Sequence, residues 1–193
     1  MAHQKFDVSK IERLEDVARF ESLDPDVMWA ALGSPSPRVI VDIGAGTGLF
    51  ARRFAAMTPG ATVFAADTAP VMLQWIDEHP DPVVGERIKP LLAEESKVPL
   101  ADDSADLAIM INLHHELIDP AASYREALRL LCPGGQLLVV DWAPGNTEGG
   151  PPQHIRATPE KIIGLLERAG FVNAAAHAGL PKHSIVTARK NVQ

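Results

Sequence analysis

Three glycines at alternating positions, Gly44, Gly46 and Gly48, constrain the fold of this chain more than any other feature. They follow directly on the β-branched run 39–43, and a helical pattern of apolar residues begins at Leu49. Glycine adopts positive φ without strain and lets another molecule lie close to the backbone. The sequence thus predicts a strand, a tight turn and the start of a helix within about a dozen residues. This arrangement is typical of a ligand-binding loop.

Apolar runs and helical periodicities alternate along the rest of the chain. Strands are expected over residues 39–43, 61–66, 87–92, 105–113, 136–142, 171–178 and 184–189. Helices are expected between them, with starts marked by Asp119-Pro120 and Thr158-Pro159. This alternation predicts a single doubly wound, Rossmann-like α/β domain. Its seven-stranded sheet is expected to be mostly parallel, with an antiparallel edge strand and helices on both faces.

Residues 1–36 precede the first strand and are predicted to form an N-terminal helical arm, leaving 37–193 as the ligand-binding domain. Apolar residues recur at helical spacing between Ile11 and Phe20, and Asp24-Pro25 marks the start of a second short helix. The arm is either a helical layer packed on one edge of the sheet or a lid over a pocket, with Phe6 as part of that lid.

The composition of the chain excludes some classes of binding partner. The 193 residues carry a formal net charge of −7, which argues against a broad phosphate-binding surface and hence against nucleic acid. The single cysteine, Cys132, fits a reducing compartment. No run approaches 18 apolar residues, and residues 1–10 show no signal-peptide pattern. We expect a cytoplasmic protein without a membrane span that acts on a small molecule; a homodimer is compatible with these features.

In an open α/β sheet, ligands bind at the carboxyl ends of the strands. The second predicted strand is followed by Asp67, where a carboxylate can accept hydrogen bonds from ribose hydroxyls. Asp67 can equally cap the helix that begins at Pro70, and the two roles are compatible. A dinucleotide fingerprint, G-x-G-x-x-G, would need glycine where this chain has Leu49.

The glycine loop, together with the acidic Asp42 before it, resembles motif I of the class I S-adenosylmethionine-dependent methyltransferases. The segment 93–100, followed by Asp106, is similar to that family's Gly-Asp-Ala-x-x-Leu-Pro-Phe pattern, with Ala93 replacing Gly and Glu94 replacing Asp. The resemblance covers about residues 38–142. The start at 3–7 and the Gly-Pro-Pro segment at 150–156 look like the small ubiquinone/menaquinone-methyltransferase-like group within the family.

This resemblance implies that S-adenosyl-L-methionine is the cofactor and S-adenosyl-L-homocysteine the product. It implies that the glycine loop and Asp42 hold the methionyl group, that Asp67 holds the ribose, and that Glu94 contacts the adenine. The full set of implied cofactor-binding residues is Asp42, Gly44, Ala45, Gly46, Gly48, Asp67, Thr68, Met72, Glu94, Glu95 and Asn112.

The acceptor side is predicted from the ends of the fourth and fifth strands. His115 is the candidate catalytic residue, because an imidazole can take a proton from a hydroxyl or an acidic carbon near neutral pH. Residues expected on the substrate side are Phe6, His114, Asp141, Trp142, His154 and Arg156. The other interpretation is that the histidines only fill the strand end and that 144–156 is an ordinary surface loop.

A metal site is not expected. The sequence from His115 begins like the zinc motif H-E-x-x-H, but Asp119 stands at the second histidine position, and no motif supports a divalent cation at Asp141, Asn112 and His115. The chain is thus predicted to be a methyltransferase that moves a methyl group in line to an unidentified small-molecule acceptor. Two alternatives remain. One is an NAD(P)-dependent oxidoreductase, disfavoured by Leu49 and the missing Tyr-x-x-x-Lys pair; the other is a non-catalytic module that binds S-adenosylmethionine.

Overall fold

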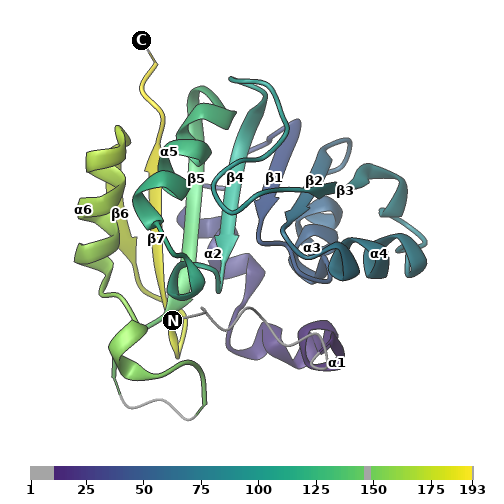
Figure 1. Ribbon diagram of the computed structural model, residues 1–193, viewed down its shortest axis with the longest axis horizontal. Coiled ribbons are helices and arrows are strands. Elements are labelled where there is room, and N and C mark those ends of the chain that lie inside the picture. Colours follow the sequence, from purple (N-terminus) through teal and green to yellow (C-terminus); the bar gives the residue numbers. More distant parts are fainter. Residues whose placement is uncertain (1–10, 146–148, 193) are drawn as a thin grey trace.

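A seven-stranded sheet organises the molecule, with the strand order β3-β2-β1-β4-β5-β7-β6 (Figure 1). The computed structural model describes residues 11–145 and 149–192. In chain order the strands are β1 (Val39–Ile43), β2 (Thr62–Asp67), β3 (Ile88–Leu92), β4 (Ala105–Ile111), β5 (Leu131–Trp142), β6 (Val172–His177) and β7 (His183–Arg189).

Helices flank this sheet on both faces (Figure 1). The α-helices are α1 (Ile11–Glu15), α2 (Pro25–Ala31), α3 (Leu49–Met57), α4 (Pro70–Glu78), α5 (Pro120–Leu130) and α6 (Pro159–Ala169). Short 3-10 helices are η2 (Val17–Glu21), η3 (Gly85–Arg87), η4 (His114–Glu116) and η5 (Gln153–Ile155). Four of the α-helices begin with proline in the first turn, where its missing N–H costs nothing. None of the helices described is long and apolar enough to cross a membrane.

The topology confirms the predicted fold class. β1 is central and pairs in parallel with β2 and β4, while β4 pairs in parallel with β5. The antiparallel pairing predicted near one edge is made by β7, which lies between β5 and β6. The chain runs outward from β1 in both directions, so strand order reverses between β1 and β4. A crevice for a ligand is expected at the carboxyl end of such a switch point.

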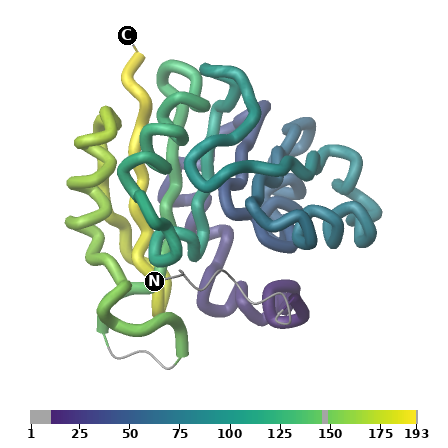
Figure 2. Tube along the Cα trace, viewed as in Figure 1, coloured from purple at the N-terminus to yellow at the C-terminus, as the bar shows by residue number. Residues whose placement is uncertain are grey.

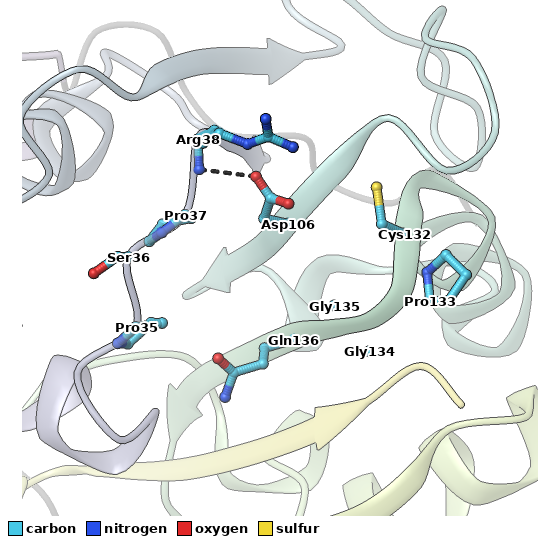
Figure 3. Close-up of a pocket in the computed structure, with 10 residues that line it drawn as sticks. All are labelled: Pro35, Ser36, Pro37, Arg38, Asp106, Cys132, Pro133, Gly134, Gly135 and Gln136. Carbon is cyan, nitrogen blue, oxygen red and sulfur yellow. Dashed lines mark hydrogen bonds between the residues drawn. The ribbon is translucent and has the colours of Figure 1, made fainter. Parts of the chain in front are cut away.

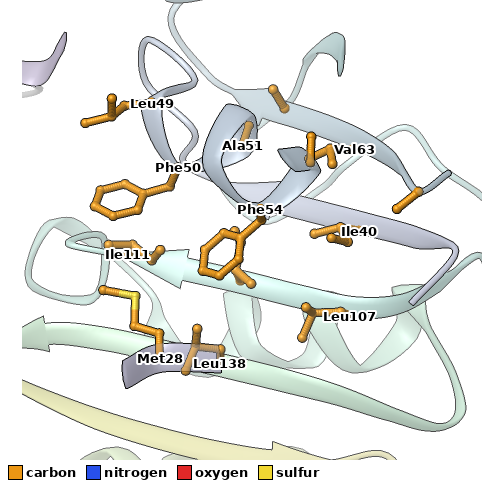
Figure 4. Packing of buried hydrophobic residues seen from close by; sticks show 14 of the residues in the cluster. Met28, Ile40, Leu49, Phe50, Ala51, Phe54, Val63, Leu107, Ile111 and Leu138 are labelled. Atoms are coloured by element: carbon orange, nitrogen blue, oxygen red, sulfur yellow. The ribbon is translucent and has the colours of Figure 1, made fainter. Parts of the chain in front are cut away.

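Two hydrophobic clusters fill the space between the sheet and the helices. Successive residues of β1 face opposite clusters: Ile40 packs into one and Val41 into the other. The first cluster is centred on Phe54 of α3, which is fully buried (Figure 4). Met28 of α2 belongs to the same cluster, so part of the N-terminal arm contributes to the core. This packing fixes α3, and with it the glycine loop that precedes α3.

Three boundaries differ from the sequence prediction. β5 begins at Leu131 rather than at 136, because Leu131 pairs with Ala105 ahead of a register shift in the β4–β5 ladder. β4 ends at Ile111 because Asn112 adopts a φ of 55° and turns the chain out of the sheet. The arm is not one continuous helix from 11 to 20: Asp16 ends α1 and caps η2 by accepting a hydrogen bond from the Ala18 amide.

The arm and the segment after β5 lie at the same edge of the sheet. In Figure 2 the purple arm and the green segment that follows β5 both lie at the lower edge, where β4 and β5 end. The glycine loop after β1 opens onto this edge as well. The structure therefore brings together, around the switch point, the parts of the chain from which the sequence predicted a site.

Candidate functional site

The glycine loop is a tight turn that needs glycine at three positions. Gly44, Gly46 and Gly48 have φ values of 75°, 54° and 81°, a region that other residues rarely adopt. The amides of Gly44 and Ala45 both donate to the carbonyl of Ala66, at 2.8 and 3.0 Å, which ties the loop to β2. A Cβ atom on Gly44 would lie 2.7 Å from the Leu113 side chain. At Gly44 the loop backbone, which carries no side chain, therefore faces Leu113, just after the end of β4.

Asp67 links the glycine loop to the start of α4. Its Oδ2 accepts a hydrogen bond from the Gly46 amide at 2.8 Å, and its Oδ1 accepts one from the Ala69 amide at 2.9 Å. The second bond lies just ahead of α4, but the N-cap of α4 is Ala69 and has no side-chain cap, so Asp67 does not cap this helix as the sequence suggested. Each carboxylate oxygen can accept more than one hydrogen bond, so these contacts leave capacity for ribose hydroxyls.

Buried polar atoms without a hydrogen-bond partner gather at this edge of the sheet. Within the described residues, Oδ2 of Asp42, Oδ1 of Asn112 and both ring nitrogens of His183 are buried and unpaired. Asp42 and Asn112 belong to the ends of β1 and β4, and His183 begins the antiparallel β7, so all three lie at the carboxyl edge. Buried polar atoms are nearly always hydrogen-bonded in native proteins. A polar ligand that supplies the missing partners, such as the amino-acid end of S-adenosylmethionine, fits this site.

Asp42 is the most perturbed acid of the site. It is 2% exposed, and burial together with the nearby Asp67 carboxylate raises its pKa from 3.8 to about 7, although the Arg19 charge acts in the opposite direction. The negative charge of Asp42 is thus poorly compensated in the protein alone. A cationic group of a ligand placed beside it would favour the ionised form.

His115 and Asp141 form a hydrogen-bonded pair across the ends of β4 and β5. His115 Nδ1 lies 2.9 Å from Asp141 Oδ1 and 3.2 Å from Oδ2, and Asp141 is 1% exposed. Burial alone would lower the pKa of His115, but the hydrogen bond and charge of Asp141 outweigh it and the pKa is raised. With the Nδ1 proton donated to Asp141, Nε2 is the basic nitrogen. This arrangement orients an imidazole for proton transfer.

His114 is placed differently from its neighbour. It is buried, and its Nδ1 lies 2.7 Å from the hydroxyl of Tyr124, whose ring stacks on the imidazole. Burial lowers the pKa of His114, so it is neutral at physiological pH. The structure thus assigns His114 a partner within the fold, as the alternative interpretation of the strand end proposed.

Arg156 and Trp142 organise the segment after β5. The Arg156 guanidinium donates to the carbonyls of Pro151, Ala143 and Gly149, and its Cζ lies 5.3 Å from the centre of the Trp142 ring. Arg156 therefore ties Ala143, directly after β5, to Gly149 and Pro151. His154, also predicted on the substrate side, is exposed on η5.

The remaining predicted cofactor residues lie around the ends of β2 and β3. Glu94 is exposed and its backbone pairs with Lys97, while Glu95 accepts a hydrogen bond from the Ile118 amide at 2.8 Å. Thr68 is exposed directly after β2, and Met72 is buried in α4. Phe6 lies outside the described residues.

A cavity of about 340 Å³ lies away from this site, near the amino ends of the strands (Figure 3). Arg38 precedes β1, and Asp106 lies early in β4, where its carboxylate accepts a hydrogen bond from the Arg38 amide. None of the residues that line this cavity belongs to the predicted site. Within the described part of the chain, no three His, Cys, Asp or Glu side chains are grouped to hold a metal ion.

Two residues of the site, His183 and Arg19, were not predicted from the sequence. His183 packs against Trp142, with ring centres 4.3 Å apart, and burial lowers its pKa to about 4. It could have been found, because the first residue of a strand antiparallel to β5 must lie beside the end of β5. Arg19 lies near Asp42, and its guanidinium is 5.1 Å from the centre of the Phe50 ring. No sequence signal marked Arg19, since charged residues alternate with apolar ones throughout the arm.

Comparison with known proteins identifies the family. A family model described as a methyltransferase domain matches residues 41–139, which is about half of the chain. The chain is 34% identical over 102 residues to a malonyl-[acyl-carrier protein] O-methyltransferase of Hahella chejuensis, covering 53% of this chain and 36% of that protein. It is 28% identical over 137 residues to a demethylmenaquinone methyltransferase of Thermus thermophilus, covering 68% and 62%. The chain thus spans less than two thirds of the length of these curated relatives.

Solved structures agree with this assignment. A SAM-dependent methyltransferase from Aquifex aeolicus superposes with a TM-score of 0.88 at 27% identity, over 96% of this chain and 99% of that one. The [4+2]-cyclase SpnF, at 18% identity and a TM-score of 0.75 over 89% and 81% of the two chains, shares the fold alone. The chain belongs to the methyltransferase domain family, within the predicted class I S-adenosylmethionine-dependent methyltransferases. The prediction of S-adenosylmethionine as cofactor is confirmed with it.

Proposed function

We propose that this protein transfers a methyl group from S-adenosylmethionine to a small-molecule acceptor that bears an ionisable hydroxyl or an acidic carbon. The observation that carries the acceptor chemistry is the contact between His115 Nδ1 and Asp141 at 2.9 Å. This pair lies where β4 and β5 end, beside the switch point that the glycine loop lines. A buried carboxylate that orients an imidazole is of use chiefly when a proton must be removed from the acceptor.

S-adenosylmethionine, when bound, supplies a methyl group on a positively charged sulfur, which makes that methyl an electrophile. In this proposal the glycine loop and Asp42 hold the methionyl group, Asp67 holds the ribose, and Glu94 and Glu95 border the adenine. Thr68, Met72 and Asn112 complete the cofactor contacts. Support comes from the bare backbone of the loop and from the unpaired buried oxygens of Asp42 and Asn112. Binding and alignment are the main contribution expected from the protein.

His115 then acts as the general base. Its Nε2 would take the acceptor proton as the acceptor oxygen or carbon bonds to the methyl carbon and the methyl–sulfur bond breaks, which leaves S-adenosylhomocysteine. Asp141 would stabilise the resulting imidazolium. The raised pKa of His115 supports this role, because it increases the strength of the base while leaving it largely neutral above that pKa. The other residues predicted on the substrate side remain predictions: Phe6, His114, Trp142, His154 and Arg156. The arm remains a proposed lid.

Methyl transfer from radiolabelled S-adenosylmethionine tests this proposal. Phenols, carbon acids and carboxylates would be offered to the wild type, to His115→Asn and to the control His79→Asn, which changes an exposed histidine of another region. We expect transfer to phenols or carbon acids, reduced about 100-fold or more in His115→Asn and unchanged in His79→Asn. Equal rates in His115→Asn and the wild type would contradict the base role. A protein that binds S-adenosylhomocysteine but methylates none of these classes would support the non-catalytic alternative.

The proposal also includes where the protein acts and what it does not bind. A cytoplasmic location and the absence of nucleic acid as a partner are supported by the single cysteine and the net charge of −7. A homodimer stays a prediction.

A further inference from the structure

Arg19 is a half-buried cation at the edge of the glycine loop. It lies on η2 of the arm, where its Nη1 donates to the Leu14 carbonyl at 2.8 Å. The guanidinium carbon lies 5.1 Å from the centre of the Phe50 ring, in the first turn of α3. The side chain is thus held over the helix that follows the glycine loop rather than extended into solvent.

The guanidinium has no ion-pair partner among the described carboxylates. Its nearest acidic neighbours in sequence are otherwise engaged: Glu15 binds Arg52 at 2.7 Å, and Asp16 caps η2. Burial is the main cause that lowers the pKa of Arg19 from its ordinary value. A cation that is taken out of water without a counter-ion is destabilising unless something else supplies the negative charge.

The groups around Arg19 are complementary to an amino acid. Asp42 lies close enough for the Arg19 charge to act on its pKa, and Asp42 Oδ2 is buried without a partner. A buried carboxylate oxygen without a hydrogen-bond partner and a half-buried guanidinium without an ion-pair partner therefore border the same glycine loop, Asp42 just before it and Arg19 over the first turn of the helix that follows it. Two further arginines near this edge are already in use: Arg52 binds Glu15 and the Thr47 carbonyl, and Arg156 donates to the carbonyls of Gly149 and Pro151.

We propose that Arg19 binds the α-carboxylate of the methionyl group of the S-adenosyl ligand, while Asp42 receives its ammonium group. This inference rests on the proposed function and extends it to a residue of the arm. A guanidinium forms paired, charge-assisted hydrogen bonds with a carboxylate, which lysine does not reproduce. The positive charge of Arg19 then has its counter-ion only when the ligand is bound.

Contacts between the arm and the loop hold Arg19 in place for this role. The Leu14 side chain lies 3.3 Å from where a Cβ of Gly46 would be, and Phe20 packs edge-on against Phe50 with ring centres 5.5 Å apart. The Glu15–Arg52 ion pair connects α1 to α3. The arm is therefore attached to the loop on several sides, and loss of the Arg19 guanidinium alone should leave it attached.

The test compares two ligands that differ only in the carboxylate. S-adenosylhomocysteine and its decarboxylated analogue, which keeps the adenosine, the sulfur and the amine, would be titrated calorimetrically into the wild type, Arg19→Met and Arg13→Met. Arg13 is an exposed arginine of the same arm and serves as the control. We expect Arg19→Met to weaken binding of S-adenosylhomocysteine about 10- to 100-fold, the range for a hydrogen bond between charged groups. Binding of the analogue should change less than about twofold, and Arg13→Met should resemble the wild type with both ligands.

The outcomes separate this inference from the proposed function. If Arg19→Met loses affinity equally for both ligands, Arg19 only supports the arm and the inference is wrong. A wild type that binds both ligands equally well also overturns it, and this comparison needs no variant that folds. Arg19→Lys should recover only part of the lost affinity. A wild type that does not bind S-adenosylhomocysteine at all overturns the proposed function and, with it, the role of Arg19.

Discussion

Replacement of Asp42 by asparagine should make the protein without ligand more stable at high pH. Asp42 is 2% exposed, one of its oxygens has no partner, and its pKa is raised to about 7 by burial and by Asp67. Asparagine has nearly the same shape and no charge. The variant therefore removes the cost of ionising this group inside the fold and leaves the packing of β1 as it is.

The size and sign of the effect follow from proton linkage. A carboxyl whose pKa is higher in the folded than in the unfolded state stabilises the fold below the unfolded value, and this stability is lost as pH rises toward the folded value. Raising the pKa from 3.8 to about 7 corresponds to a total loss of about 4 kcal/mol, since a tenfold change in proton affinity is worth about 1.4 kcal/mol. Of this total, roughly 2 to 3 kcal/mol of unfolding free energy is lost between pH 5 and pH 8.

Urea denaturation of the ligand-free protein at several pH values between 5 and 8 measures this effect. The free energy of unfolding of the wild type, relative to that of Asp42→Asn, should fall by roughly 2 to 3 kcal/mol across this range. Asp77→Asn, at an exposed acid of α4, should follow the wild type. Parallel curves for Asp42→Asn and the wild type would refute the reasoning, because they would mean that Asp42 titrates alike in the folded and unfolded protein.

Three further predictions follow from the site and the core. Gly44→Ala should weaken S-adenosylhomocysteine binding measured by calorimetry, whereas Gly60→Ala, which has a similar positive φ but open space around it, should lose stability only; equal affinities would contradict the close approach at the loop. Asp141→Asn should lower the pKa of His115 in an NMR titration, because the hydrogen bond and the charge of Asp141 both raise it; an unchanged pKa would show that Asp141 does not set it. Phe54→Ala should cost about 3 to 5 kcal/mol in urea denaturation, and a cost below about 1 kcal/mol would contradict its central place in the core.

Much of the fold could be predicted because its signals are local. Buried parallel strands read as apolar runs, and Asp119 and Thr158 cap helices as their positions before proline suggest. The start of β5 could not be predicted, since Pro133-Gly134-Gly135 looks like a turn. The pairing of Leu131 with Ala105, and the backbone hydrogen bonds of Gly134 and Gly135 with Lys190, keep this segment in the sheet.

The sequence predicted most residues of the site but not which of their side chains contact one another. Asp42, the glycine loop and Asp67 lie close together because strand order places the ends of β1 and β2 side by side. The pairing of His115 with Asp141 depends on the alignment of β4 with β5, over a sequence separation of 26 residues. No pattern in the sequence encodes that alignment. Arg19 was missed for a similar reason, because its position depends on how the arm folds back over α3.

Calorimetric titration of the wild type with S-adenosylhomocysteine and, separately, with NAD⁺ tests the central claim most directly. We expect saturable 1:1 binding of S-adenosylhomocysteine and no measurable binding of NAD⁺. The glycine loop, Asp42 and Asp67 fit the first ligand, and Leu49 stands where a dinucleotide site needs glycine. Binding of NAD⁺ without binding of S-adenosylhomocysteine would contradict the assignment of this site to a methyl donor.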